Sequence, residues 1–189
     1  MTPPLVAEIG RVLAEVPGEA GFFVPNKLML HGRWLRYSSG YPVYQVRLFH
    51  RNRLRFENCG HGQREVASGK LGYLREPYLH NGFAKGITDW LHKHVAYAAL
   101  EAEIYDGQEQ VSIFDLIARD AVKRRRAAKR YFRCLPGRPT IRALHSLILM
   151  RGLLDGRSGI MYARMLATFE AMVDVYRAER RLGRVKRKR

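Results

Sequence analysis

The sequence predicts a protein of mixed α and β structure, in which strands come first and a basic, mostly helical region follows. Three apolar runs separated by Gly-containing turns lie between residues 41 and 81, a pattern typical of short strands. From about Ile87 onward the apolar residues change to a helical spacing of three and four. Strands followed by helices predict an α+β arrangement. We therefore expect a first part at 1–107 and a second, helical part at 108–189.

The chain opens with a predicted helix and a predicted strand. Apolar residues from Leu5 to Val16 recur at helical spacing behind Pro3-Pro4, and proline suits the first turn of a helix. Pro17-Gly18 is expected to end this helix. The aromatic and β-branched run at residues 21–25 then indicates a strand.

Three more strands are predicted before the helical region, at residues 44–50, 54–58 and 71–79. Pro77 lies inside the last of these runs. Because proline cannot donate a hydrogen bond to a neighbouring strand, this run is expected to be an edge strand or an irregular one. We expect the strands of this part to pair mostly antiparallel.

Four helical segments are predicted in the rest of the chain. The second of them follows Ser112, and Asp115 lies three residues later, which resembles a capping box with Asp in place of Glu or Gln. Prolines and glycines separate the later segments. The predicted helices are 87–106, 113–133, 144–150 and 161–176, with breaks at Pro136-Gly137-Arg138-Pro139 and at Gly152, Gly156 and Gly159.

The net charge of the chain restricts the partners that it is expected to bind. Of 189 residues, 34 are Lys or Arg and 17 are Asp or Glu, which gives a formal net charge of +17. This excess predicts an anionic partner, such as nucleic acid, anionic lipid head groups or a phosphorylated substrate. Charge alone does not choose among them.

The compartment follows from cysteine usage and hydropathy. Cys59 and Cys134 lie far apart and form no C-x-x-C motif, which argues against a disulfide framework or a zinc site and favours a reducing cytoplasm. The first residues lack the basic and then apolar pattern of a signal peptide. No apolar run reaches the ~18 residues that a membrane-spanning helix needs.

The densest cluster of reactive side chains lies between the second and third strand candidates, at His61, Gln63, Arg64 and Glu65. Glu65 is expected in a turn after a strand, four residues from His61 and next to Arg64. A carboxylate in such a place can accept a proton from a substrate hydroxyl. The alternative is a solvated turn, in which Glu65 and Arg64 form an ion pair and His61 caps the loop. The residues alone leave both interpretations open.

A succession of short stretches, in matching order and spacing over residues 2–180, resembles one known family. The stretches are Phe22-Phe23-Val24-Pro25, Gly32-Arg33-Trp34, Tyr41-Pro42, Gln45-Val46-Arg47-Leu48-Phe49, His61-Gly62-Gln63-Arg64-Glu65, Gly72-Tyr73-Leu74, Pro77 to His80, Lys93-His94 with Tyr97 and Glu101, and Gly152 with Leu154-Asp155-Gly156 and Gly159. Together they resemble the carboxyl-terminal half of bacterial family-2 glycosyltransferases of the GT-A type. These enzymes build lipopolysaccharide cores and exopolysaccharides.

The resemblance implies an α/β fold, of which this chain would be the acceptor-side half. It implies transfer of a sugar from a nucleotide-sugar donor to a lipid-linked or cell-envelope glycan, with a divalent cation, Mn or Mg, as cofactor. Family members carry an Asp-x-Asp motif in a preceding nucleotide-binding half, and this chain contains no Asp-x-Asp. We therefore expect an acceptor-side fragment that is inactive alone, or a subunit that works with a separate donor-binding chain.

The resemblance also implies roles for single residues. Glu65 would be the catalytic base, and His61 would lie near the diphosphate or ligate the metal. Gln63 and Arg64 would hold sugar hydroxyls or a phosphate, and Arg47 would contact the site or brace a carboxylate. His80 is a further candidate for donor or acceptor binding, whereas Trp34, Trp90 and Tyr97 are expected in the core.

The basic second part is predicted to dock on an anionic membrane surface at the cytoplasmic face. Its apolar segments at 141–154 and 160–176 are interrupted by arginines, as in helices that lie in a membrane interface. The residues expected at the surface are Lys123, Arg124, Arg125, Arg126, Lys129 and Arg130.

Three other interpretations of the second part remain open. The basic clusters, with Tyr131 and Phe132 between them, could bind nucleic acid, although no helix-turn-helix, zinc-finger or ribonucleoprotein-type motif is present. The region could instead be a helical bundle with a solvated basic face. The chain could also be a non-catalytic partner subunit of a glycosyltransferase.

Overall fold

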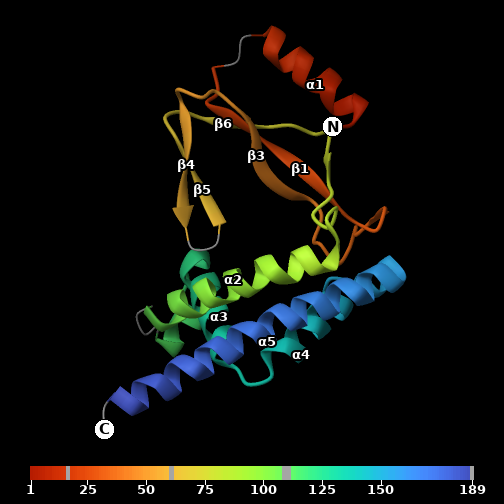
Figure 1. Ribbon diagram of the computed structural model, residues 1–189. Helices are drawn as coiled ribbons and strands as arrows, with labels where there is room; N and C mark the ends of the chain where they lie inside the picture. Colours follow the sequence, from red (N-terminus) through yellow and green to blue (C-terminus); the bar gives the residue numbers. More distant parts are fainter. Residues whose placement is uncertain (16–17, 60–61, 108–111, 188–189) are drawn as a thin grey trace.

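The computed structural model describes residues 1–15, 18–59, 62–107 and 112–187. The α+β class is confirmed: a strand-rich part that carries the first helix lies at one end, and the remaining helices lie together at the other (Figure 1). The elements in chain order are α1 (Pro3–Ala14), β1 (Gly21–Leu30), β2 (Arg33–Trp34), β3 (Val43–Phe49), β4 (Leu54–Cys59), β5 (Gly62–Ala67), β6 (Leu71–Tyr73), β7 (Tyr78–His80), α2 (Gly86–Gly107), η1 (Ile113–Ile117), α3 (Ala121–Cys134), α4 (Arg138–Leu144), η2 (His145–Leu149), η3 (Gly152–Asp155) and α5 (Gly156–Arg187).

The main sheet is built around β1, which is longer than the strand predicted at 21–25. β3 pairs with β1 antiparallel, and β2 pairs antiparallel with the last two residues of β1. On its other side β1 pairs in parallel with β6 and then with β7. The expectation of a mostly antiparallel arrangement is correct for β2 and β3 but misses these two parallel pairings.

The single strand predicted at 71–79 is interrupted. It divides into β6 and β7, which pair with different halves of β1, and Pro77 lies in the gap just before β7. The proline lacks the N–H that a continuous ladder would need. The expectation of irregularity at Pro77 is therefore confirmed.

Glu65 lies in a strand and not in the predicted turn. β5 pairs antiparallel with β4, with Leu54 opposite Ala67 and Phe56 opposite Glu65. The residues of β5 have low intrinsic strand preference, but pairing with a neighbouring strand overrides such preferences. The result is a two-stranded hairpin that is not part of the main sheet.

Separate apolar clusters hold the elements together. Leu5 of α1 packs with Phe22 and Val24 of β1 and with Leu74. A second cluster joins the far end of β1 to the helices. It contains Leu30, Leu35, Phe83, Trp90 and Met165. The sheet therefore contacts α1 near the start of β1 and the helical part near its end.

Helices α2 and α5 pack against one another along their lengths (Figure 1). Ala98 and Ala102 of α2 and Val173 of α5 are buried between them, and alanine allows two helix backbones to approach closely. The helix predicted at 87–106 is thereby confirmed. It precedes the boundary predicted at residue 107 but packs on a helix that follows this boundary; the boundary itself stays a prediction.

The helix predicted at 113–133 is instead a short 3₁₀ helix, η1, followed by α3. The Ser112 hydroxyl accepts the N–H of Phe114 at 3.3 Å and caps η1. The Asp120 carboxylate accepts the N–H of Val122 at 2.7 Å and starts a second helix. Two competing caps therefore divide one apolar pattern into two elements.

The last helix is longer than predicted. α5 starts at Gly156 and continues through Gly159. The prediction that Gly159 interrupts the helical structure is therefore wrong. None of the helices in the described ranges is both long enough and apolar enough to cross a bilayer.

Candidate functional site

A pocket of about 470 Å³ lies between the end of the main sheet and the helical part. Its volume falls within the usual range of small-ligand sites, about 300 to 1,000 Å³. It is lined by side chains from β1, β3, β7, α2, α4 and α5 and from the loops next to them. The lining residues are Asn26, Leu28, Ser39, Val43, His80, Gly82, Phe83, Trp90, His94, Tyr97, Arg142, Tyr162, Leu166, Phe169 and Glu170.

The strands provide two polar groups of this pocket. Asn26 of β1 is buried, and its amide donates to the carbonyl of Val43 at 3.1 Å, which fixes its orientation. His80 is the last residue of β7 and lies opposite Leu28 of β1 in a parallel register. Crevices at the carboxyl ends of parallel strands are common ligand sites, and His80 lies at such an end.

Aromatic side chains of α2 form one wall of the pocket. Trp90 and His94 are four residues apart, so they project from the same face of the helix, and their rings stack with 3.8 Å between centroids. His94 Nδ1 lies 2.8 Å from the carbonyl oxygen of Trp90. The rings of Tyr97 and Phe169 both make edge-to-face contacts with the imidazole of His94. The wall is therefore apolar with a polar ring at its centre.

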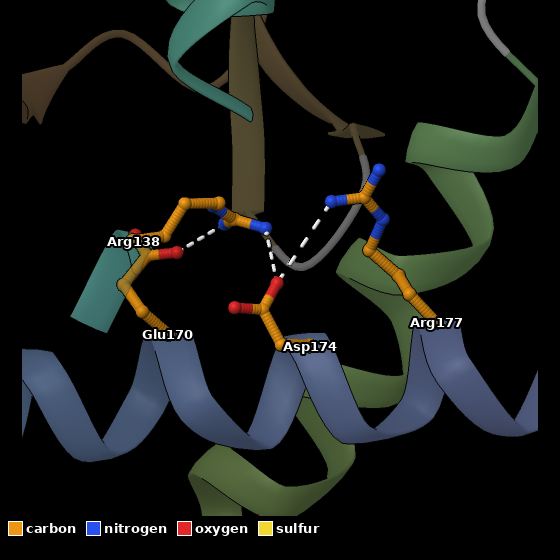
Figure 2. Close-up of polar contacts among 4 residues, drawn as sticks. All are labelled: Arg138, Glu170, Asp174 and Arg177. Atoms are coloured by element: carbon orange, nitrogen blue, oxygen red, sulfur yellow. Dashed lines mark hydrogen bonds and ion pairs between the residues drawn. The ribbon is translucent and has the colours of Figure 1, made fainter. Parts of the chain in front are cut away.

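Charged groups of the pocket come from α4 and α5. Arg142 is half-buried, and its Nη1 lies 3.4 Å from Nδ1 of His145. Glu170 lines the pocket and is also bound by the buried Arg138, as Figure 2 shows. Burial raises the pKa of the Tyr162 hydroxyl, against a smaller opposite effect of Arg142. The pocket thus combines hydrogen-bond donors and acceptors with rings.

Partial burial lowers the pKa of His80 from 6.5, and the positive charge of Arg47 lowers it further. The neutral imidazole is therefore favoured, which leaves one ring nitrogen as an acceptor and the other as a donor. Arg47 itself donates from Nε to the Tyr78 hydroxyl at 3.2 Å and from Nη2 to Gln45 at 2.7 Å. The structure therefore places Arg47 beside the pocket, where it acts on His80.

The titration of His80 is a direct check of this geometry. We expect its ring, followed by NMR in the folded protein, to titrate below pH 6.5. Arg47→Gln should raise this pKa in part, because burial, the larger cause, remains. A wild-type value at or above 6.5 would contradict the burial of His80.

The same shift makes the stability of the fold depend on pH. Because the lowered pKa favours the neutral ring in the folded state, the contribution of His80 to the unfolding free energy is fully present above the pKa of His80 in the unfolded chain. It is lost as the pH falls through the folded value. His80→Gln should therefore reduce the fall in unfolding free energy between pH 7 and pH 5, measured by urea titration.

The residues predicted as the reactive cluster lie elsewhere. Gln63, Arg64 and Glu65 belong to β5 of the hairpin, opposite Asn58, Glu57 and Phe56. Gln63 and Arg64 are exposed, and Glu65 is partly buried. Among the described residues that line the pocket, none comes from this hairpin. His61 lies outside the described residues, and the catalytic role of Glu65 stays a prediction.

The residues predicted at the membrane surface lie in α3. Lys123, Arg124 and Arg125 are exposed there, and Arg124 Nη1 donates to the carbonyls of Ala118 and Arg119 at 2.9 and 3.0 Å. Arg126, Lys129 and Arg130 belong to the same helix. Their membrane contact stays a prediction.

A metal site was predicted from resemblance alone. In the part of the chain that the structure describes, no three His, Cys, Asp or Glu side chains come together as metal ligands would. His61, the proposed ligand, is outside this part. The metal ion stays a prediction, and we derive no chemical step through one.

Comparisons with known proteins add no family. No protein-family model, curated protein or solved structure matches the chain. The case for a function therefore rests on the residues and on the geometry of the pocket.

Sequence reasoning found part of this pocket and missed the rest. His80 was predicted as a site residue, and Trp90 and Tyr97 were predicted as core; all three line the pocket. Asn26, Arg142, Tyr162 and Glu170 were not predicted. They lie up to 144 positions apart, counted as 170 minus 26, and no local pattern links them.

Proposed function

We propose that this chain provides the acceptor side of a glycosyltransferase, and that the pocket between sheet and helices binds a sugar of the acceptor glycan. The acceptor would be lipid-linked or part of the cell envelope, at the cytoplasmic face of a membrane. The donor would be a nucleotide sugar.

One observation carries this proposal. Residues from two separate stretches of the family resemblance line the same pocket: His80 from one, and His94 and Tyr97 from the other. Other such stretches meet as well. Asp155 binds the loop that follows Gly32-Arg33-Trp34, accepting backbone N–H groups of Arg36 and Ser38 at 3.1 and 2.7 Å. A resemblance of sequence stretches gains support when the stretches converge in space.

The chemistry of the pocket also supports a sugar as ligand. A pyranose presents hydroxyl groups around its edge and apolar C–H groups on its faces. Asn26, Arg142 and Glu170 offer donors and acceptors for the hydroxyls, whereas the rings of Phe83 and Trp90 offer apolar contact. The volume of about 470 Å³ accommodates one or two sugar rings.

Sugar transfer also requires a base for the acceptor hydroxyl. Glu65 remains the residue that we propose for this role, on the basis of the resemblance; since it does not line the pocket, it would act on an acceptor hydroxyl that extends outside the pocket. Glu170 lines the pocket, but its ion pair with Arg138 occupies one of its oxygens. We therefore do not assign the base to Glu170.

The first experiment tests sugar binding by saturation-transfer NMR and calorimetry. The purified chain is titrated with a panel of methyl glycosides, and separately with UDP- and GDP-sugars in the presence of Mn²⁺. We expect at least one glycoside to bind, with its signals lost in Arg142→Gln and in His80→Gln. Arg142→Gln removes a positive charge from the pocket and His80→Gln removes the imidazole; the loss of a charged hydrogen bond, as at Arg142, weakens binding by about 1.5 to 3 kcal/mol.

The matched controls are Arg181→Gln and His92→Gln, which make the same two changes at exposed residues that do not line the pocket, so glycoside binding should persist in both. Arg64→Gln and Glu65→Gln on the hairpin test the site that the resemblance implies. Loss of binding in the hairpin variants with retention in the pocket variants would move the site to the hairpin. Absence of binding to every glycoside and nucleotide sugar would refute the proposed function.

A further inference from the structure

The turn between α4 and α5 displays an aliphatic ridge, which we define as Leu144, Ile148, Leu149, Leu153 and Leu154. The exposed fractions of these five side chains range from 49% for Leu144 to 74% for Leu149. Beside them lies an apolar recess of about 540 Å³, lined by Ile141, Arg142, Leu144, His145, Ile148 and Leu149. Exposed apolar patches of this kind on a folded protein mark sites of contact.

The inner side of this turn is fixed, so the exposure of the ridge is a property of the fold. The Asp155 carboxylate accepts the N–H groups of Arg36, Tyr37 and Ser38 and the Ser38 hydroxyl. A side chain at Gly152 would come within 2.5 Å of the carbonyl oxygen of Ser146. The turn is thus packed closely against the 36–38 loop, whereas Leu153 and Leu154 next to this contact are exposed.

Three exposed arginines lie within or just after the ridge in the sequence. Arg151 lies between Leu149 and Leu153, and Arg157 and Arg164 follow on α5. Arg157, Ile160 and Arg164 are spaced by three and four residues, which places them on one helix face. The only acidic residue from 138 to 169 is Asp155, and its carboxylate is bound to the 36–38 loop. The local charge is therefore strongly positive.

We infer that the ridge inserts into the boundary between head groups and acyl chains of an anionic bilayer, with Arg151, Arg157 and Arg164 at the level of the lipid phosphates. Aliphatic side chains framed by arginines are typical of interfacial membrane contacts. Protein-binding patches are instead enriched in Tyr and Trp, and the ridge contains neither. The sequence predicted membrane contact both for the basic run of α3 and for the apolar segments 141–154 and 160–176, and the inference assigns the inserted part to this turn.

The ridge lies next to the pocket described above. Arg142 lines both the pocket and the apolar recess, so a bilayer that covers the ridge lies close to the pocket. The inference does not depend on the proposed function, since membrane binding is measured without sugar or nucleotide. Failure of either proposal is therefore recognised separately.

The test is co-sedimentation of the full chain with vesicles of phosphatidylcholine and phosphatidylglycerol, and with vesicles of phosphatidylcholine alone. We expect Leu149→Glu with Leu154→Glu to weaken binding to the anionic vesicles by about tenfold or more, because two charges would enter the interface. Replacement of Arg151, Arg157 and Arg164 by Gln should remove the preference for anionic vesicles.

The matched control is Val175→Glu, on the exposed face of α5 at 68% exposure, which should bind vesicles as the wild type does. Replacement of Lys123, Arg124 and Arg125 by Ser tests the competing surface on α3. Wild-type binding by the ridge variant, with loss in the α3 variant, would overturn the inference. A lipid-free dimer in sedimentation velocity that Leu149→Glu dissociates would also overturn it, because a second copy would then cover the ridge.

Discussion

Arg138→Ala is expected to cost the folded protein about 3 to 5 kcal/mol of unfolding free energy, which is the usual effect of removing one partner from a buried ion pair. The Arg138 side chain is 1% exposed. It lies between two carboxylates of α5, binding Glu170 through Nη2 and Asp174 through Nη1, the latter at 2.9 Å (Figure 2). Without the guanidinium, Glu170 remains largely buried and loses its counter-charge.

Urea unfolding of the variant and the wild type measures this effect. Arg181→Ala, which replaces an exposed arginine on α5, is the control and should change the unfolding free energy by less than about 0.5 kcal/mol. Adding Glu170→Gln to Arg138→Ala should recover part of the loss, because the uncompensated charge is then removed. A loss below about 1 kcal/mol for Arg138→Ala would contradict the structural role of this ion pair.

Gly159→Ala is the second large effect that we expect. A Cβ at this position would lie 2.0 Å from the carbonyl oxygen of Gly152 and 2.9 Å from Cβ of Asp155. Backbone must therefore move, and overpacking of this kind costs about 1 to 3 kcal/mol or more. Since the displaced segment contains Asp155, the contacts of its carboxylate with the 36–38 loop should weaken as well.

Gly183→Ala provides the matched control for this variant. Gly183 lies in the same helix, α5, and apart from its chain neighbours and the adjacent helix backbone nothing lies within 4 Å of the Cβ that it would gain. Alanine is preferred over glycine inside a helix by about 1 kcal/mol, so this variant should be slightly more stable than the wild type. We expect Gly159→Ala to lower the unfolding free energy and Gly183→Ala to raise it. If both variants changed the unfolding free energy in the same direction, close packing at Gly159 would not limit stability.

Helices with a clear apolar period were predictable from the sequence. The patterns at the N-terminus and at 87–106 correspond to α1 and α2, which each bury one face against a neighbouring element. The break predicted at Pro136-Gly137-Arg138-Pro139 lies between α3 and α4, but its last two residues already form the start of α4. In these segments local spacing and burial agree, so a local pattern is sufficient.

The strands were predicted less completely. Residues 62–67 have no strand-like pattern, and they form β5 only because β4 pairs with them. β6 and β7 lie parallel to β1, and only three-dimensional packing brings them to it. The predicted role of Glu65 depended on a turn that is a strand, so the residue has neighbours different from those expected.

The sequence by itself determined the class of the fold, the positive charge and the order of strands and helices. These follow from composition and from periods of a few residues, which act within one element. Tertiary structure alone decided the burial of Arg138, the gathering of Asn26, His80, Arg142 and Glu170 at one pocket, and the outward direction of the aliphatic ridge. Each of these depends on contacts between elements far apart in the chain, and local periodicity carries no information about such distances.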